Sequence, residues 1–568
     1  MEYYDLGNHT WPVTTSAPEA QTWFDRGLIW AYGFNHEEAV HCFEQALGRD
    51  PGCAMAHWGV AYALGPNYNK PWAAFDEADL RMSTERAVAA CSRAGRLAAE
   101  VTPAERALIG ALRWRYAPDE LPDDRQAWNE RYAEAMGRVY EAFPGDPDVA
   151  ALYADALMNL TPWQLWDLRT GEPAEGARTV RARAVLDRAL ASPGGRVHPG
   201  VLHMYIHLME MSPYPERARP AAERLRGLVP DAGHLRHMPT HLDVLCGDYA
   251  RVVASNTEAI AADEKYAARS GAMNFYTLYR VHDYHFKIYG AMFLGQAQTA
   301  LDGAAELEAA IPDKLLRVQS PPMADWLEGF LAMRVHVLVR FGRWADILEL
   351  PLPADAVLYS VTTAMLHYGR GVACSALGRI TAAERERELF GRARAAVPAT
   401  RTIFNNTCAD ILAIAAAMLD GELEYRKGNI EAAFAHLRDS IALDDGLPYD
   451  EPWGWMQPTR HAYGALLLEQ GRVAEAEAVY RADLGFDDTL PRAYQHPGNI
   501  WSLHGYHECL VKLGKPAEAR IIEQQLRFAA AMADTPVQAS CFCRLPVPVT
   551  RRRAGPSRYG RRGRPTSR

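Results

Sequence analysis

Residues 23–51 read WFDRGLIWAYGFNHEEAVHCFEQALGRDP, a pattern typical of two antiparallel helices joined by a short turn. The small residues Gly27 and Ala39 let the two helices approach closely, and aromatic side chains such as Phe43 fill the space between them. Pro51 has no backbone N–H and therefore ends the second helix. The stretch predicts one compact helix–turn–helix unit.

This stretch resembles a complete tetratricopeptide repeat (TPR) of about 34 residues. The consensus residues W, G, Y, A, F, A and P fall on Trp23, Gly27, Trp30, Ala39, Phe43, Ala46 and Pro51. Later in the chain, a turn glycine is followed five positions on by a small or branched residue in the pairs Gly247/Val252, Gly295/Ala300, Gly342/Ile347, Gly378/Ala383, Gly428/Ala433, Gly471/Ala476 and Gly514/Ala519. The resemblance implies an all-α fold, a right-handed α-solenoid of TPR-like helix–turn–helix repeats.

The strength of the repeat pattern divides the chain into segments. We expect N-terminal TPR-like repeats at residues 1–75, divergent helical repeats at 76–195 and His-rich TPR-like repeats at 196–310. C-terminal TPR-like repeats follow at 311–530, and a disordered basic tail at 531–568. The tail is predicted from composition, because from about Leu545 it consists mainly of Arg, Pro, Gly and Ser, with little apolar surface to bury.

Three segments in the His-rich region each carry a close pair of histidines: HPGVLHMYIHLMEM at 198–211, HLRHMPTHLDVLCGDY at 234–249 and HDYHFKIYGAMFLG at 282–295. The pairs are spaced i,i+4 or i,i+3, which places both side chains on one side of a helix. The candidate metal ligands are His203, His207, Glu210, His237, His241, His282 and His285.

The TPR resemblance implies that these side chains face one concave groove from three adjacent repeats. Imidazole is a common ligand of Zn, Fe and Cu, so we expect a divalent transition metal in the groove. HMYIH lacks the glutamate of HExxH, which argues against a thermolysin-type protease. A single glutamate argues against a carboxylate-bridged di-iron site. Zinc hydrolysis and copper or iron redox chemistry stay open.

A second set of residues suits ligand binding. PYDEPWGWMQPTRH at 448–461 combines aromatic walls with a cation, and HPGNIWSLHGYHE at 496–508 echoes the first histidine segment. The candidates for binding a small molecule or peptide are His336, Trp453, Trp455, Arg460, His461, His504 and Glu508.

Two other functions fit the same groove. A TPR adaptor would bind a peptide or partner protein without catalysis, although adaptors that grip acidic tails use Lys, Arg and Asn where this chain has His and aromatic residues. A metal storage or delivery protein would bind ions without turnover. The sequence does not choose among these functions, and it does not set the oligomeric state.

Composition narrows the class of protein. The 568 residues carry a net charge of -9, which argues against nucleic-acid binding by the folded body. The N-terminus has no secretory signal pattern, and no apolar run reaches the roughly 20 residues that span a membrane. Nine cysteines without a framework spacing suit a reducing compartment. We expect a cytoplasmic protein with no membrane association.

Overall fold

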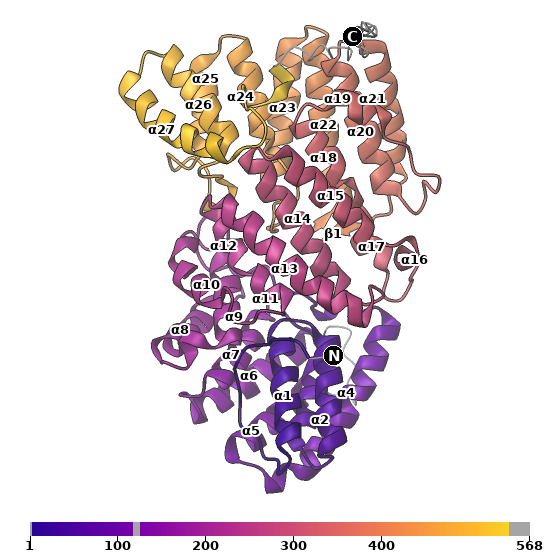
Figure 1. Ribbon diagram of the computed structural model, residues 1–568, viewed down its shortest axis with the longest axis vertical. Helices are drawn as coiled ribbons and strands as arrows, with labels where there is room; N and C mark the ends of the chain where they lie inside the picture. The colour runs from indigo at the N-terminus through magenta and orange to yellow at the C-terminus, as the bar shows by residue number, and fades with distance from the viewer. Residues whose placement is uncertain (1–2, 117–124, 545–568) are drawn as a thin grey trace, which may run out of the picture.

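The computed structural model describes residues 3–116 and 125–544, so the basic tail from Leu545 lies outside the described residues. The described chain is a solenoid of α-helices that pack in sequential pairs (Figure 1), which confirms the predicted fold class. Its strands are two residues long and form one antiparallel hairpin, β1 (Thr402–Ile403) with β2 (Asn406–Thr407).

The first half of the solenoid contains short and medium helices joined by long loops. Its helices are α1 (Pro18–Tyr32), α2 (His36–Arg49), α3 (Ala54–Ala63), α4 (Glu77–Leu97), α5 (Pro103–Leu112), α6 (Gln126–Ala142), α7 (Pro147–Met158), α8 (Thr179–Ala191), α9 (Pro199–Glu210), α10 (Arg219–Leu225), α11 (Gly233–His237) and α12 (Pro239–Leu245).

The second half contains the more regular repeats. Its helices are α13 (Tyr249–Ser270), α14 (Thr277–Leu294), α15 (Ala297–Ala310), α16 (Asp313–Leu316), α17 (Met323–Leu327), α18 (Met333–Arg340), α19 (Trp344–Glu349), α20 (Ser360–Ala376), α21 (Ile380–Ala395), α22 (Cys408–Arg426), α23 (Ile430–Asp445), α24 (Thr459–Glu469), α25 (Val473–Asp483), α26 (Ile500–Lys512) and α27 (Pro516–Met532).

The turn glycines adopt the backbone conformation for which the repeat needs them. A positive φ ends one helix and reverses the chain, and glycine reaches it without a Cβ clash. The small residues five positions later, such as Ala300 and Ala433, are fully buried between the paired helices. Positive φ angles of 61–86° occur at Gly247, Gly295, Gly342, Gly378, Gly428, Gly471 and Gly514.

The apolar interior forms two main cores that meet near α12 and α14. The first core runs from Leu6 to Leu242 with a few later residues, and the second from Val244 to Cys543. In Figure 1 the first half lies at the bottom and the second half at the top. The helices that carry the histidine segments lie where the two halves join. The segment boundaries given above stay predictions.

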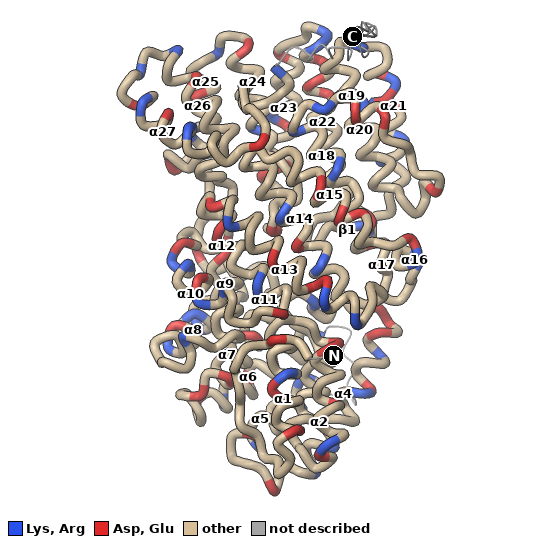
Figure 2. Tube along the Cα trace, viewed as in Figure 1, with Lys and Arg blue, Asp and Glu red and all other residues tan. Residues whose placement is uncertain are grey.

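Acidic and basic residues are intermixed along the chain (Figure 2). Within the described ranges, no helix combines the length and apolar character that crossing a lipid bilayer requires. Cys541 and Cys543 form a disulfide, which the sequence pattern did not predict.

Candidate metal centre

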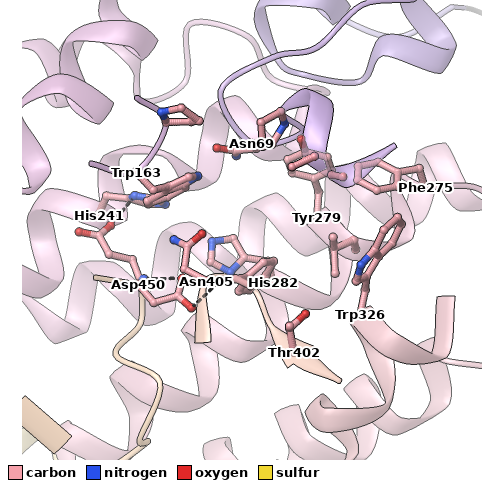
Figure 3. A pocket seen from close by; sticks show the side chains of 17 residues that line it. Asn69, Trp163, His241, Phe275, Tyr279, His282, Trp326, Thr402, Asn405 and Asp450 are labelled. Atoms are coloured by element: carbon pink, nitrogen blue, oxygen red, sulfur yellow. Dashed lines mark hydrogen bonds and ion pairs between the residues drawn. The ribbon is translucent and has the colours of Figure 1, made fainter. Parts of the chain in front are cut away.

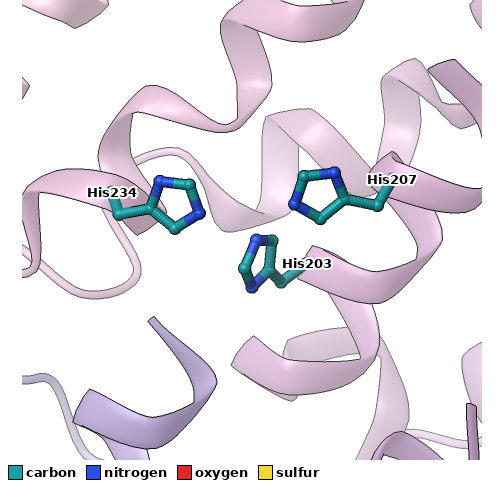
Figure 4. Close-up of side chains that lie close together, drawn as sticks. All are labelled: His203, His207 and His234. Carbon is teal, nitrogen blue, oxygen red and sulfur yellow. The ribbon is translucent and has the colours of Figure 1, made fainter. Parts of the chain in front are cut away.

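Three imidazoles converge in a first group at the start of the His-rich segment. His203 and His207 come from α9 and His234 from α11, and one nitrogen of each lies within 4.8 Å of the others. Figure 4 shows the three rings turned toward one another. All three side chains are buried.

The hydrogen bonds of the first group leave lone pairs pointing inward. His203 donates from Nδ1 to the carbonyl oxygen of Tyr32 at 2.6 Å, so its Nε2 carries a lone pair. Within the described chain, Nε2 of His203, Nε2 of His207 and both ring nitrogens of His234 have no hydrogen-bond partner. Buried polar atoms without partners are rare, and a bound ion is one explanation for them.

His237, His241 and His282 form a second group from α11, α12 and α14. His237 donates from Nδ1 to Oδ1 of Asn256 at 2.7 Å, because the amide nitrogen of Asn256 donates to the carbonyl of Val252. The Nε2 lone pair of His237 therefore faces Nε2 of His241, 2.8 Å away. Either a proton on His241 or a cation between the rings must relieve this contact.

Glu210 links the two groups. Its Oε1 lies 3.0 Å from Nδ1 of His207, and its Oε2 lies 2.7 Å from Nδ1 of His241. An ionised Glu210 accepts from both Nδ1 atoms and leaves both Nε2 atoms free as ligands, the usual way in which a carboxylate orients a metal-binding histidine. Glu210 was predicted as a ligand, and its geometry suits an orienting role behind the ligands.

A second carboxyl group shares the Nδ1 of His241. Glu451 comes from the loop between α23 and α24 and contacts the same nitrogen. Burial and the nearby Glu451 raise the pKa of Glu210 to about 8, and burial raises the pKa of Glu451. Without a cation the pair therefore keeps a proton at neutral pH. A bound dication would favour the two carboxylates.

Burial favours the neutral form of five imidazoles in the cluster. In each of these five, the pKa lies well below its usual value, mainly because of burial and secondly because of neighbouring histidines. Neutral imidazole is the metal-binding form of histidine. The five are His203, His207, His234, His237 and His282.

The i,i+4 spacing of His237 and His241 predicted one helix, but the second histidine segment forms two helices. Pro239 has no N–H to donate, so α11 ends at His237 and α12 begins at Pro239. Met238 between them keeps helical angles, so His237 and His241 still face each other.

The prediction missed one member of the cluster and included a residue that lies outside it. His234 stands i,i+3 from His237, the same spacing as His282 and His285, but it was not among the predicted ligands. His285 is one turn beyond His282, with ring centroids 6.5 Å apart, but it does not belong to the second group. Its Nε2 contacts the sulfur of Met456 at 2.8 Å, and its ring packs on Phe330.

The cluster lies in a closed interior, which corrects the expectation of an open concave groove. Phe34, Trp163 and Phe404 come from three separate loops and pack on the imidazoles, with centroid distances of 4.5 Å to His203, 5.6 Å to His207 and 4.7 Å to His282. These aromatics are the described non-glycine residues with positive φ, at 58°, 59° and 48°. Such backbone strain is typical of functional sites.

The second group borders a cavity of about 340 Å³. His241 and His282 form part of its wall, together with Asp450 and Glu451 (Figure 3). Among the described residues, His203, His207 and His234 do not line this cavity. The first group is therefore separate from this cavity, and the second borders it.

The residues predicted to bind a ligand do not line this cavity. Trp453, Trp455 and Arg460 line a separate space of about 10 Å³, which is barely enough for one water molecule. Arg460 is paired with Asp445 at 2.7 Å, and the indole N–H of Trp453 donates to Asp444.

The other predicted ligand-binding residues are held by partners in the second half. His461 lies 3.0 Å from Asp483, and Glu508 is paired with Arg544 at 2.8 Å. His336 packs against Trp455 with centroids 4.7 Å apart, and His504 is partly exposed on α26.

A further polar group, missed from the sequence, lies near the N-terminus. Nε2 of His9 and Nε2 of His198 lie 3.0 and 2.9 Å from Oδ1 of Asp148, which also accepts from the hydroxyl of Tyr32. Nδ1 of His198 accepts from the N–H of Val201, so its Nε2 carries the proton. Asp148 is thus the acceptor of a hydrogen-bond network, and this group is not set up to bind a metal.

No protein-family model matches this sequence, and no curated protein matches it. Two solved structures align along most of the chain. The first, "Crystal structure of APC/C hetero-tetramer Cut9-Hcn1", is 11% identical over 92% of this chain and 94% of that chain, with a TM-score of 0.27. The second, "Structure of Naa15/Naa10 bound to HypK-THB", is 14% identical over 90% of this chain and 71% of that chain, with a TM-score of 0.20. Both TM-scores are too low to bear on function.

Proposed function

We propose that this solenoid binds two transition-metal ions, one in each histidine group. We propose further that the protein is a metal-dependent enzyme of redox or hydrolytic type, whose catalytic ion lies beside the cavity. The observation that carries the proposal is the inward convergence of imidazole nitrogens, with the outer nitrogens of His203, His207, His237 and His241 held by oxygen atoms. This is clearest at His203 and His237, whose Nδ1 atoms donate to a carbonyl and an amide oxygen that do not titrate.

The donor set suits Zn, Cu or Fe. Each group offers three imidazoles, and imidazole binds all three metals well. Three protein ligands and an open position are typical of catalytic zinc sites, whereas structural zinc is usually held by four protein ligands. An ion bound here would supply Lewis-acid or redox chemistry.

The cavity favours catalysis over storage. The group of His237, His241 and His282 has a space beside it that could admit a substrate, and Glu451 can hold or release a proton at the same wall. A pure storage site needs no such space. The enclosed group of His203, His207 and His234 would then tune or support its neighbour through Glu210.

Metal analysis of the purified full chain tests the proposal. We expect about two ions per chain after expression with Zn, Fe and Cu supplied, because each group offers three ligands. His234→Asn should remove the ion of the first group, and His282→Asn that of the second. His57→Asn is the control, since His57 is a buried histidine of α3 outside both groups.

The outcomes separate the functions. Metal content far below one ion per chain in the wild type would overturn the proposal and leave a hydrogen-bonded histidine core, as in an adaptor. Equal loss in His57→Asn would show that the ions bind without specificity. Two ions without turnover on any substrate would indicate storage or delivery.

A further inference from the structure

Aromatic side chains form much of the wall of the cavity beside the second histidine group. Five aromatic side chains line it: Trp163, Phe275, Tyr279, Trp326 and Phe404. Figure 3 shows Phe275, Tyr279 and Trp326 on one side and Trp163 near His241 on another. Phe275 packs edge-on against Trp326 with centroids 5.5 Å apart, so this wall is continuous.

The charge of the walls is equally one-sided. Of the described residues that line the cavity, none is Lys or Arg, whereas Asp450 and Glu451 are both acidic. The cation next to this wall is Lys70, whose ammonium lies 4.7 Å from the Phe275 ring centroid but is paired with Asp79 at 2.7 Å. A carboxylate or phosphate group would meet acidic side chains and find no free protein cation.

The space fits one substituted ring. An engineered cavity of about 150 Å³ holds benzene, so about 340 Å³ takes a ring with substituents or two fused rings. Rings that stack or meet edge to face add affinity beyond that of their buried area. The strained backbones of Trp163 and Phe404 hold two of the ring walls in place.

We propose that this cavity binds a small molecule with an aromatic ring and no negative charge, such as a phenol or an aromatic amine. The assignment rests on the proposed function, because the ligand would be the substrate of an ion held by His237, His241 and His282. The aromatic walls supply stacking. Asp450, Glu451 and Asn405 offer hydrogen-bond partners to a hydroxyl or amino group on the ring, and the described lining residues include no Lys or Arg to pair with an anion.

Three matched probes test the assignment by calorimetry on the full chain after chelation, where no metal ion can bind a carboxylate: 4-ethylphenol, tyramine and 3-(4-hydroxyphenyl)propionate. They share one ring and differ in charge. We expect the neutral and cationic probes to bind and the anionic probe to bind at least tenfold more weakly. Equal or tighter binding of the anion would overturn the proposal.

Variants locate the binding. Trp326→Ala should weaken binding of 4-ethylphenol at least fivefold while leaving the metal content unchanged, since Trp326 contacts no histidine of the cluster. Trp114→Ala is the control, because Trp114 is half exposed and does not line the cavity. No effect of Trp326→Ala would place the probe elsewhere and overturn the assignment.

Repeating the titration of 4-ethylphenol on metal-loaded protein separates the two proposals. Ring binding that survives in protein without metal supports the cavity assignment even if the metal sites fail. Protein that holds its ions but binds none of the three probes overturns the cavity assignment and leaves the metal sites standing.

Discussion

One carboxyl group, that of Glu210, contacts an imidazole of each histidine group. It lies i,i+3 from His207 on α9 and reaches His241 on α12, so a single side chain sets the orientation of two rings. Side chains that orient metal ligands typically change affinity by 10–100-fold when they are replaced. Glu210 is therefore the residue through which the two groups depend on each other.

Glu210→Gln tests that dependence. An amide has one acceptor oxygen, so it can orient His207 or His241 but not both. We expect metal affinity to fall about 10–100-fold with the fold retained, measured by competition with a chromogenic chelator. The control is Glu422→Gln, a second buried glutamate, which is paired with Arg426 far from the histidines. A similar loss of affinity in the control would remove the special role of Glu210.

Spacing along helices predicted most of the cluster but not its packing. The i,i+4 pairs gave His203, His207, His237 and His241, because a helix fixes their relative directions. Helix spacing could also have found His234, which stands i,i+3 from His237, although its contact with His203 and His207 depends on the path of α11 toward α9. Glu451 could not be found in this way, because it arrives from a loop more than 200 residues later in the chain. Such contacts depend on tertiary packing.

At the scale of elements, the turn glycines are the most predictable feature. Their positive φ follows from the reversal of the chain between paired helices, which is local and repeats with the sequence. The closed interior around the histidines was not predictable, because the long loops that carry Trp163 and Phe404 interrupt the repeat. Repeats set helix pairs, and insertions set what covers them.

Gly378 and Gly391 distinguish the effect of backbone conformation from the effect of the space around a side chain. A Cβ at Gly378 or at Gly391 would meet nothing within 4 Å, but only Gly378 has a positive φ, of 70°. Gly378→Ala should therefore lower the free energy of unfolding by about 1 kcal/mol, from left-handed backbone strain. Gly391→Ala, inside α21, should raise it by up to about 1 kcal/mol. Urea unfolding followed by circular dichroism measures both, and the same sign for the two would contradict this account of the turn.

At the scale of the whole molecule, the histidine cluster joins two apolar cores. α9 and α11 pack in the first core, while much of α14, which carries His282, packs in the second. The loop with Glu451 also reaches the cluster from the second half. An ion held by His237, His241 and His282 would thus bond the two halves directly, in addition to the apolar contacts between them.

Removing metal should therefore lower the stability of the junction between the halves. A ligand at about 1,000 times its dissociation constant adds about 4 kcal/mol to the folded state, which for a protein of this size corresponds to roughly 3 °C in Tm. We expect calorimetry to show a lower Tm after chelation and to resolve the single transition into two, because each half keeps its own core. His282→Asn, which cuts the bond from the second half, should show the two transitions before chelation and a smaller shift after it. An unchanged Tm in protein that has lost its ions would mean that the ions do not join the halves.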